Sequence, residues 1–386
     1  MTYNFDQYIE RRGSDCYKWG DYGDDVLPLW VADMDFPAPE AVIRALHERV
    51  AHGVFGYGRP SPELLDVICD RMQQLYQWTV TPDQLIFLPG LVTGLNVVCR
   101  AIGRPGEGVL IQTPVYPPFL KAPLNHGRTL DMAGLVLKRA GNLLSYDIDY
   151  DAFEAAITAR TGLFILCNPH NPTGHCYTRE ELTRLAEICL RHKLTICADE
   201  IHCDLLLNNA RHTPLASLSP EIAAHTITLM APSKTFNLAG LKCSFAIVPN
   251  PDLRRRLAIA SSTMALAVNI MGYTAALAAY RDGAEWLTGL RRYLTANRDF
   301  VVNYVQENLP GLSTTVPEAT YLAWLNCCEA GIEGNPYQFF LKQARVALND
   351  GVHFGPGGEG FVRLNFGCPR STLVQALERM RAALVG

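Results

Sequence analysis

Three side chains in separated segments could carry out chemistry. Lys234 offers an amine, which can act as a nucleophile or, where burial lowers its pKa, as a general base. Asp199 ends the apolar run LTICAD, where an unpaired carboxylate is costly to desolvate, so we expect a cation beside it. Arg363 offers a planar guanidinium that can pair with both oxygens of a carboxylate. These three side chains lie in residues 199–202, 233–242 and 361–366, and a fourth segment, residues 168–174, carries the amide of Asn171.

A glycine-bounded turn at residues 90–94 could bind an anion. It contains Val92 and Thr93 and lies between the apolar run QLIFL and a predicted helix beginning near Gly94. Free backbone N–H groups and the helix dipole favour negative charge at such a position. Ser233 and Lys242 could add a hydroxyl and a positive charge. We therefore expect an anion to bind at this turn.

The elements that must position these groups follow an α/β pattern. Continuous apolar runs, separated by amphipathic or loop stretches, predict a mostly parallel sheet covered on both faces. Thr178, with Glu181 three residues later, predicts a capping box that opens a helix running to about His192. The runs are QLIFL, GVLIQT, LFILC, LTICAD, TITLM and CSFAIV.

Both ends of the chain lack this regular alternation of strands and helices. Amphipathic helices are predicted from Pro39 and from Ser371, with a long helix after Trp286 and strands near residues 321–325 and 361–366. We therefore expect a smaller α+β domain built from both chain ends. The predicted divisions are residues 1–48 for the N-terminal segment and part of the small domain, 49–283 for the large domain, and 284–386 for the C-terminal small domain.

Composition excludes several functional classes. The 386 residues are 48% hydrophobic and 19% charged, with a net charge of −4, so the positive charge expected of a nucleic-acid binder is missing. Residues 264–279 are interrupted by polar positions and predict a buried helix rather than a membrane span. His47 and His52 are one residue too far apart for a helical zinc motif, and we expect no metal.

Targeting and cysteine usage point to a cytoplasmic protein. The N-terminus carries Asp6 and Glu10 and lacks the basic and then apolar order of a secretory signal. The twelve cysteines are scattered, without a disulfide framework or zinc spacing. We expect reduced thiols that serve as small core residues.

Taken together and in order, the four segments resemble the fold-type I pyridoxal-phosphate enzymes of the class I/II aminotransferase superfamily. The resemblance covers nearly the whole chain. Within that superfamily, LPLWVADMDF, FGYG, TPVYPPF, DEIHCD, PSKTFNLAG and FVRLNFGCPR look like the cystathionine β-lyase, or carbon–sulfur lyase, branch. The resemblance implies a large three-layer α/β/α domain, a smaller α+β domain and pyridoxal 5′-phosphate as cofactor.

The resemblance also implies roles around the cofactor. Lys234 matches the lysine that bonds to the cofactor aldehyde and later serves as general base for the substrate α-proton. Asp199 matches the partner of the pyridine nitrogen, and Tyr116 the aromatic residue stacked on the ring. Asn171 matches the amide donor to the phenolic oxygen. His202 stands where many transaminases have tyrosine, so it is either a cofactor neighbour or a histidine held in a surrounding layer.

Other positions match groups that bind substrate or a second chain. Arg363 matches the clamp on the substrate carboxylate, with Trp30 and Asn171 as further substrate-binding positions. Tyr57 matches a tyrosine that reaches the phosphate of the neighbouring subunit, which implies a homodimer with shared active sites. Arg59, beside it, is the candidate for a distal substrate carboxylate.

The expected function is a β-lyase acting on cystathionine or another S-substituted L-cysteine, with a thiol, pyruvate and ammonia as products. An aminotransferase is the alternative, because both reactions begin by removing the α-proton and fold resemblance does not separate them. A second alternative keeps the fold and adds a regulatory protein-binding role.

Overall fold

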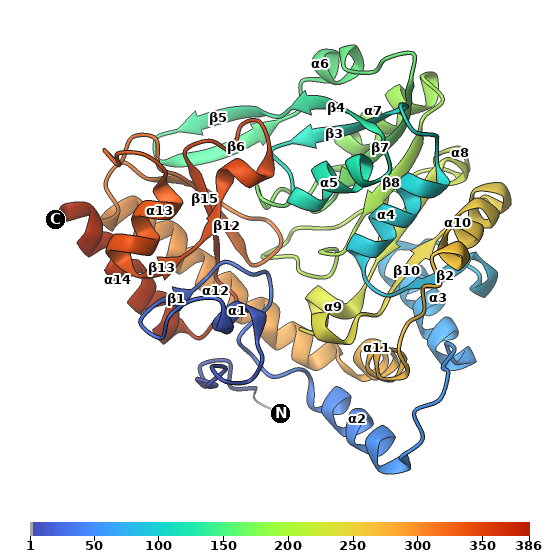
Figure 1. The fold of residues 1–386 in the computed structure, drawn as a ribbon, viewed down its shortest axis with the longest axis horizontal. Helices are drawn as coiled ribbons and strands as arrows, with labels where there is room; N and C mark the ends of the chain where they lie inside the picture. The colour runs from blue at the N-terminus through green and yellow to red at the C-terminus, as the bar shows by residue number, and fades with distance from the viewer. Residues whose placement is uncertain (1–2) are drawn as a thin grey trace.

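The computed structural model describes residues 3–386, which are organised around two sheets (Figure 1). Within these residues the larger sheet has seven strands in the order β2-β10-β9-β8-β7-β3-β4. All the neighbouring pairs from β9 to β4 are parallel, whereas β10 is antiparallel to both β9 and β2. The strands are β2 (Leu85–Leu88), β3 (Gly108–Thr113), β4 (Thr129–Gly134), β7 (Thr161–Cys167), β8 (Thr195–Asp199), β9 (Thr226–Met230) and β10 (Ser244–Ile247).

The six predicted apolar runs form six of these strands, and the predicted mostly parallel sheet is confirmed. β3 and β9 are buried along their whole length, as expected of strands covered on both faces. β4 is the strand that no apolar run marks. It lies at the edge of the sheet and is largely exposed, so its sequence needs less apolar surface.

Helices cover both faces of the larger sheet. One core cluster packs α4 (Leu91–Ala101), α5 (Pro117–Asn125) and α10 (Pro251–Thr263) against it. Another packs α6 (Tyr150–Ala155), α7 (Arg179–Arg191) and α8 (Pro220–Ala224). The predicted capping box is present at α7, because Thr178 accepts from the Glu181 amide and the Glu181 carboxylate accepts from the Thr178 amide.

The smaller sheet draws on the middle of the chain as well as on its C-terminal part. In the described part of the chain its order is β14-β15-β12-β11-β6-β5, and β11 is parallel to β6. The boundaries at 48 and 283 remain a prediction, but they miss this sharing: the hairpin of β5 and β6 lies inside 49–283. The residues of this hairpin are mostly exposed or half-buried, so its sequence carries no continuous apolar run that would assign it to a sheet. The strands are β5 (Val136–Ala140), β6 (Leu143–Asp147), β11 (Ser313–Thr315), β12 (Leu322–Asn326), β14 (Asn349–Asp350) and β15 (Phe361–Asn365).

The remaining elements join the chain ends to both sheets. The helix predicted over residues 264–279 begins only at Ile270, because the Asn269 side chain accepts from the Gly272 amide and caps α11 there. These elements are α1 (Tyr17–Gly20), α2 (Glu40–His52), α3 (Pro62–Tyr76), α9 (Pro232–Thr235), α11 (Ile270–Asp282), α12 (Ala284–Asn308), α13 (Pro336–Phe339) and α14 (Arg370–Val385), with β1 (Leu27–Pro28) paired to β13 (Val346–Ala347).

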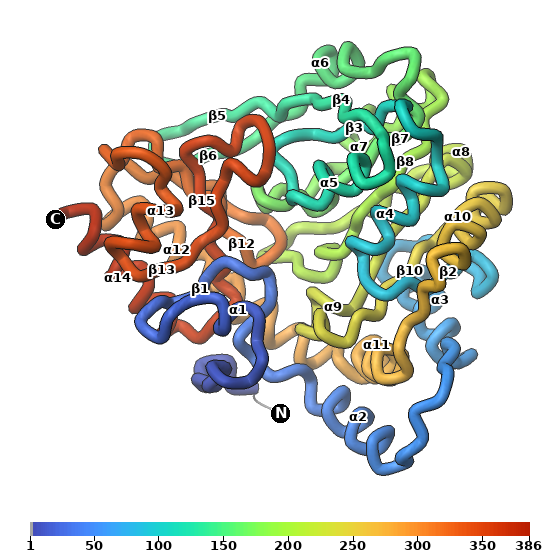
Figure 2. Tube along the Cα trace, viewed as in Figure 1, coloured from blue at the N-terminus to red at the C-terminus, as the bar shows by residue number. Residues whose placement is uncertain are grey.

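The connection between α2 and α3 runs along the periphery (Figure 2). Residues 51–59 are all exposed, including the apolar Val54 and Phe55 and the aromatic Tyr57. An extended segment with this composition leaves apolar surface uncovered within one chain.

The structure also bears on membrane-spanning helices and on the state of the cysteines. Among residues 3–386, no helix combines the length and the apolar character needed to cross a membrane. All twelve cysteines lie in this range and are free, and most of them are buried, in agreement with the expected reduced thiols.

We predict that Thr178→Ala lowers the free energy of unfolding by about 1 kcal/mol, because α7 loses its capping side chain. Urea denaturation measures the difference. Thr183→Ala, within the same helix, is the matched control and should have a smaller effect, since its hydroxyl bonds only to the Arg179 carbonyl. Equal losses for both variants would contradict a specific capping contribution.

Candidate active site

A cavity of about 400 Å³ opens where β7, β8 and β9 end. Asp199 is the last residue of β8, in register with Cys167 at the end of β7 and with Leu229 of β9. α9, which carries Lys234, follows β9 and lies near the middle of the view in Figure 1. The structure thus brings together nine of the predicted residues as cavity lining: Val92, Thr93, Tyr116, Asn171, Asp199, His202, Ser233, Lys234 and Lys242.

Asp199 presents a buried carboxylate to the cavity. It is 5% exposed and accepts a hydrogen bond from the Ile201 amide at 3.2 Å. Burial raises its pKa to about 7, although the Ile201 hydrogen bond and Lys234 oppose the change. The site is therefore short of positive charge beside Asp199, which agrees with the cation expected there.

The amine of Lys234 is held at the cavity wall. Its Nζ donates to the Ala32 carbonyl at 2.6 Å, across 202 positions of sequence. Burial lowers its pKa to about 8; Asp33 and Asp199 oppose this change, and Arg363 adds to it. An amine with such a pKa is partly neutral near neutral pH, as a general base must be.

His202 is buried beside these groups. Its ring packs edge-on to Tyr321, and its Nδ1 has no hydrogen-bond partner among the described residues. Burial, together with Lys234 and Arg363, lowers its pKa to about 3, so the imidazole is neutral. A buried unpaired ring nitrogen in a cavity wall is suited to a hydrogen bond with a bound molecule.

Arg363 adjoins the cavity without being among its lining residues. It is 3% exposed; Nη1 donates to Asn171 Oδ1 at 2.9 Å and Nη2 to the Trp30 carbonyl at 3.1 Å. Its Nε is buried without a partner in the described chain, and burial lowers its pKa to about 10. Trp30 joins the site through its backbone, since its indole packs against Tyr17 and Tyr22.

The other end of the cavity is formed by the N-terminus of α4. Gly90 is the N-cap residue at φ +108°, and no described side chain caps the helix there. The helix begins at Leu91, three residues before the predicted start, so the amides of Val92 and Thr93 belong to its first turn. With Ser233 and the exposed Lys242 nearby in the lining, this end is suited to a phosphate.

These features fit pyridoxal phosphate as a bound group. The first turn of α4 suits its phosphate, and the buried, unneutralised Asp199 suits its pyridine nitrogen. The amine of Lys234 is available for its aldehyde, and the unpaired His202 Nδ1 leaves a hydrogen bond to be made.

Tyr57 is the predicted residue that the structure places away from the cavity. Its side chain is fully exposed on the segment between α2 and α3, and Arg59 is exposed beside it. A tyrosine that reaches a neighbouring subunit would be exposed in a single chain, so its cross-chain role stays a prediction.

Some residues that line the cavity were not predicted from the sequence. Ala32, Phe119, Cys167 and Ile201 are part of its lining. Cys167 ends β7 and Ile201 lies two residues after Asp199, so the strand-end argument could have included them. Ala32 carries no reactive side chain, and its contribution through a backbone carbonyl has no signal of its own.

We predict that Asp199→Asn stabilises the cofactor-free chain at pH 8, by up to about 4 kcal/mol, because the raised pKa spans roughly three units and one unit corresponds to about 1.4 kcal/mol. A folded-state pKa raised from 3.8 to about 7 means that the folded chain binds the proton more tightly. Stability contributed by this group is therefore lost as pH rises from 4 to 7. The thermal midpoints of parent and variant should converge below pH 4. A variant that is less stable at pH 8 would contradict the charge argument.

Comparison with known proteins places the chain in a family. The model for "Aminotransferase class I and II" matches residues 24–380. Cystathionine beta-lyase PatB of Bacillus subtilis is 41% identical over 99% of this chain and 100% of its own length. The solved structure of OvoB is 44% identical with a TM-score of 0.94, covering both chains completely. The PLP-bound C-S lyase of Staphylococcus hominis is 32% identical with a TM-score of 0.94, covering 100% of this chain and 99% of its own. This chain belongs to the class I and II aminotransferase family.

Proposed function

We propose that this chain is a pyridoxal-phosphate-dependent carbon–sulfur β-lyase. The observation that carries the proposal is the 41% identity to a cystathionine β-lyase over essentially both full lengths. Its substrate is cystathionine or another S-substituted L-cysteine. Cleavage of the bond between the β-carbon and sulfur, with uptake of water, releases a thiol, pyruvate and ammonia.

The cofactor is pyridoxal 5′-phosphate, which is bound in a solved relative of 32% identity and TM-score 0.94. When bound, it supplies an electron sink for the negative charge that develops at the substrate α-carbon. The amides of residues 91–93, with Ser233 and Lys242, hold its phosphate. Asp199 would pair with the charged pyridine nitrogen, Tyr116 would pack on the ring, and Asn171 and His202 would be its polar neighbours.

The remaining groups act on the substrate. Arg363 binds the α-carboxylate with its fork of N–H donors, supported by the Asn171 side chain and the Trp30 carbonyl. Lys234 accepts the α-proton at Nζ, for which its lowered pKa is suited. Once that proton has left, the bond to sulfur can break and the thiolate departs.

The second candidate is an aminotransferase, because the family to which the chain belongs is named for that activity. Both activities use Lys234 and Arg363 in the same way up to removal of the α-proton. They differ in whether the thiolate is then expelled from the β-carbon or the amino group is transferred and the substrate leaves as a 2-oxo acid.

Product stoichiometry separates the two candidates. We predict sustained release of pyruvate, ammonia and thiol in equal amounts from cystathionine or an S-alkyl cysteine, without any added 2-oxo acid. In elimination the amino group leaves as ammonia, so no 2-oxo acid is needed to accept it and turnover continues. Turnover that stops at one equivalent per site and resumes when a 2-oxo acid is added would identify an aminotransferase.

We also infer a homodimer in which Tyr57 of one chain reaches the phosphate end of the partner's cavity. The exposed apolar surface of residues 51–59 supports this arrangement, because a second copy could cover it.

Complementation tests the dimer. Lys234→Ala and the double variant Tyr57→Phe with Arg59→Ala should each be inactive, and their heterodimers should regain one working site. At equal mixing, we expect about a quarter of parental activity. Native mass spectrometry confirms that the chains have mixed. Heterodimers without activity would show that each site is built within one chain.

A further inference from the structure

The carbonyl that holds Lys234 belongs to an irregular stretch, residues 30–36, which we call the 30–36 segment. Ala32 O accepts from Lys234 Nζ at 2.6 Å and from the Tyr321 hydroxyl at 2.8 Å. The segment follows β1 and precedes α2, and it belongs to no strand or helix. The position of the Lys234 amine therefore depends on a piece of backbone without a regular ladder of its own.

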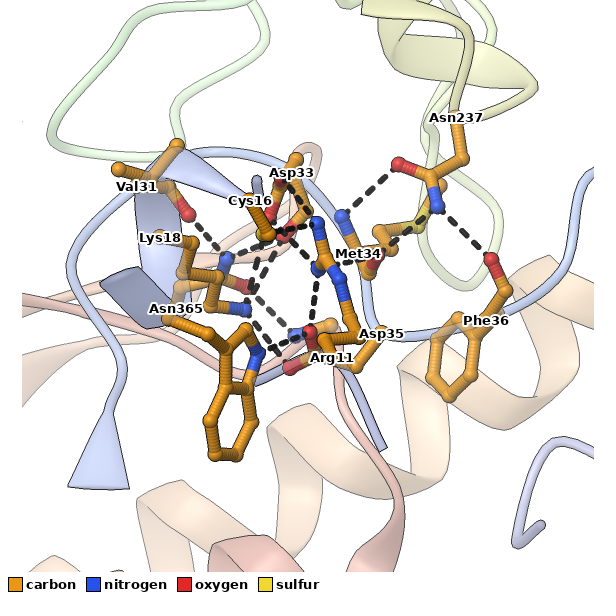
Figure 3. A network of polar contacts seen from close by, with 12 residues as sticks. Arg11, Cys16, Lys18, Val31, Asp33, Met34, Asp35, Phe36, Asn237 and Asn365 are labelled. Atoms are coloured by element: carbon orange, nitrogen blue, oxygen red, sulfur yellow. Dashed lines mark hydrogen bonds and ion pairs between the residues drawn. The ribbon is translucent and has the colours of Figure 1, made fainter. Parts of the chain in front are cut away.

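Side chains from β15 and from the chain after α9 form hydrogen bonds with the backbone of the 30–36 segment (Figure 3). Asn365 Nδ2, at the end of β15, donates to the carbonyls of Val31 and Asp33 at 2.6 Å each. Asn237, three residues after Lys234, accepts from the Met34 amide and donates to the Met34 and Phe36 carbonyls. Buried backbone groups need such partners, so these amides fix the path of the segment.

The most buried polar group of the segment is Asp35, which is 4% exposed. Lys18, itself fully buried, approaches it at 2.8 Å and Arg11 at 2.5 Å, and the Trp19 indole donates to it at 2.9 Å. Burial alone would raise the pKa of Asp35, but Lys18 and Arg11 hold it below its usual value. The carboxylate is thus charged, and it anchors the N-terminal residues to the segment.

The same cations also reach the part of the segment next to Ala32. Lys18 Nζ donates to the Asp33 carbonyl at 3.4 Å, and Arg11 donates to the Asp33 carboxylate at 2.9 Å and to the Met34 carbonyl at 3.3 Å. Removing one partner of a buried charge pair leaves the others uncompensated. A change at Asp35 would therefore be felt three residues away, at the carbonyl that holds the amine.

We propose that Asp35 is a positioning residue for Lys234: with Lys18, Arg11 and Trp19 it locks the 30–36 segment so that the Ala32 carbonyl holds the amine in place. This inference rests on the proposed role of Lys234 in proton transfer. The contribution of Asp35 is geometric, because a general base acts efficiently only when its nitrogen is held within hydrogen-bonding reach of the proton that it takes.

The test measures the Lys234 amine directly, without substrate. The full-length chain, freed of cofactor, is labelled with acetic anhydride over a range of pH, and the Lys234 peptide is quantified by mass spectrometry with Lys193 as reference. For the parent, the midpoint should lie near 8. In Asp35→Asn the segment loosens and water reaches the amine. Burial is the largest cause lowering its pKa, ahead of the effects of Asp33, Arg363 and Asp199, so the midpoint should rise by about half a pH unit or more.

Arg128→Met is the matched control. It also removes a buried charge, one that bonds to the carbonyls of Cys99, Glu107 and Gly108 and lies outside the cavity lining. It should lower the thermal midpoint and leave the Lys234 labelling midpoint unchanged. If Asp35→Asn lowers stability while its labelling midpoint stays at the parental value or falls, Asp35 is a structural residue only and the proposal is overturned.

Trp19→Phe covers the case in which Asp35→Asn does not fold. It removes one hydrogen bond to Asp35 and keeps both cations and most of the packing, so the midpoint should rise by a smaller amount. An unchanged midpoint in this folded variant, with Asp35→Asn unfolded, would likewise overturn the proposal. Labelling involves no lyase substrate, so failure of the proposed reaction would appear in the product assay and not in this one.

Discussion

Parallel pairing of β7, β8 and β9 sets Asp199 level with Cys167 and Leu229 at one edge of the larger sheet. Each of these strands is nearly or wholly buried, so the polar groups of the site can begin only where the strands end. The segments that follow these strands carry Asn171, His202 and Lys234 into one cavity. Because this alignment comes from backbone hydrogen bonds along the whole ladder, the rigid sheet positions the residues of the site.

Burial then adjusts the charges that the strand ends bring together. It raises the pKa of Asp199 to about 7 and lowers those of Lys234, His202 and Arg363 to about 8, 3 and 10. Every shift favours the neutral form, as expected where water is excluded. Perturbed groups of both signs, gathered around one cavity, are the usual mark of a catalytic site. A bound group with a phosphate and a ring cation would balance these charges.

Three separated parts of the chain meet around Lys234. The N-terminal part contributes the 30–36 segment. The chain that follows β9 contributes Lys234 on α9 and Asn237 just beyond that helix, and the smaller sheet contributes Arg363 and Asn365 on β15. Arg363 and Asn365 are two residues apart on β15, so their side chains share one face of the sheet. Their donors reach the carbonyls of Trp30, Val31 and Asp33. The proposed substrate clamp and the support of the 30–36 segment are therefore residues of one strand.

Much of this organisation could be predicted from the sequence, because continuous apolar runs and capping residues are local signals. The six runs became strands, Thr178 caps α7, and the reactive groups at strand ends line one cavity. Other features depend on contacts between distant residues. The hairpin of β5 and β6 joins the smaller sheet through pairing with β11, which no local pattern encodes. The acceptor for Lys234 is a backbone carbonyl 202 positions away, and Asp35 is an ordinary acidic residue until folding buries it between Lys18 and Arg11. The amino-acid types thus determined which chemistry was available, whereas tertiary packing decided which groups meet and in which charge state, because burial and hydrogen-bond geometry exist only in the folded chain.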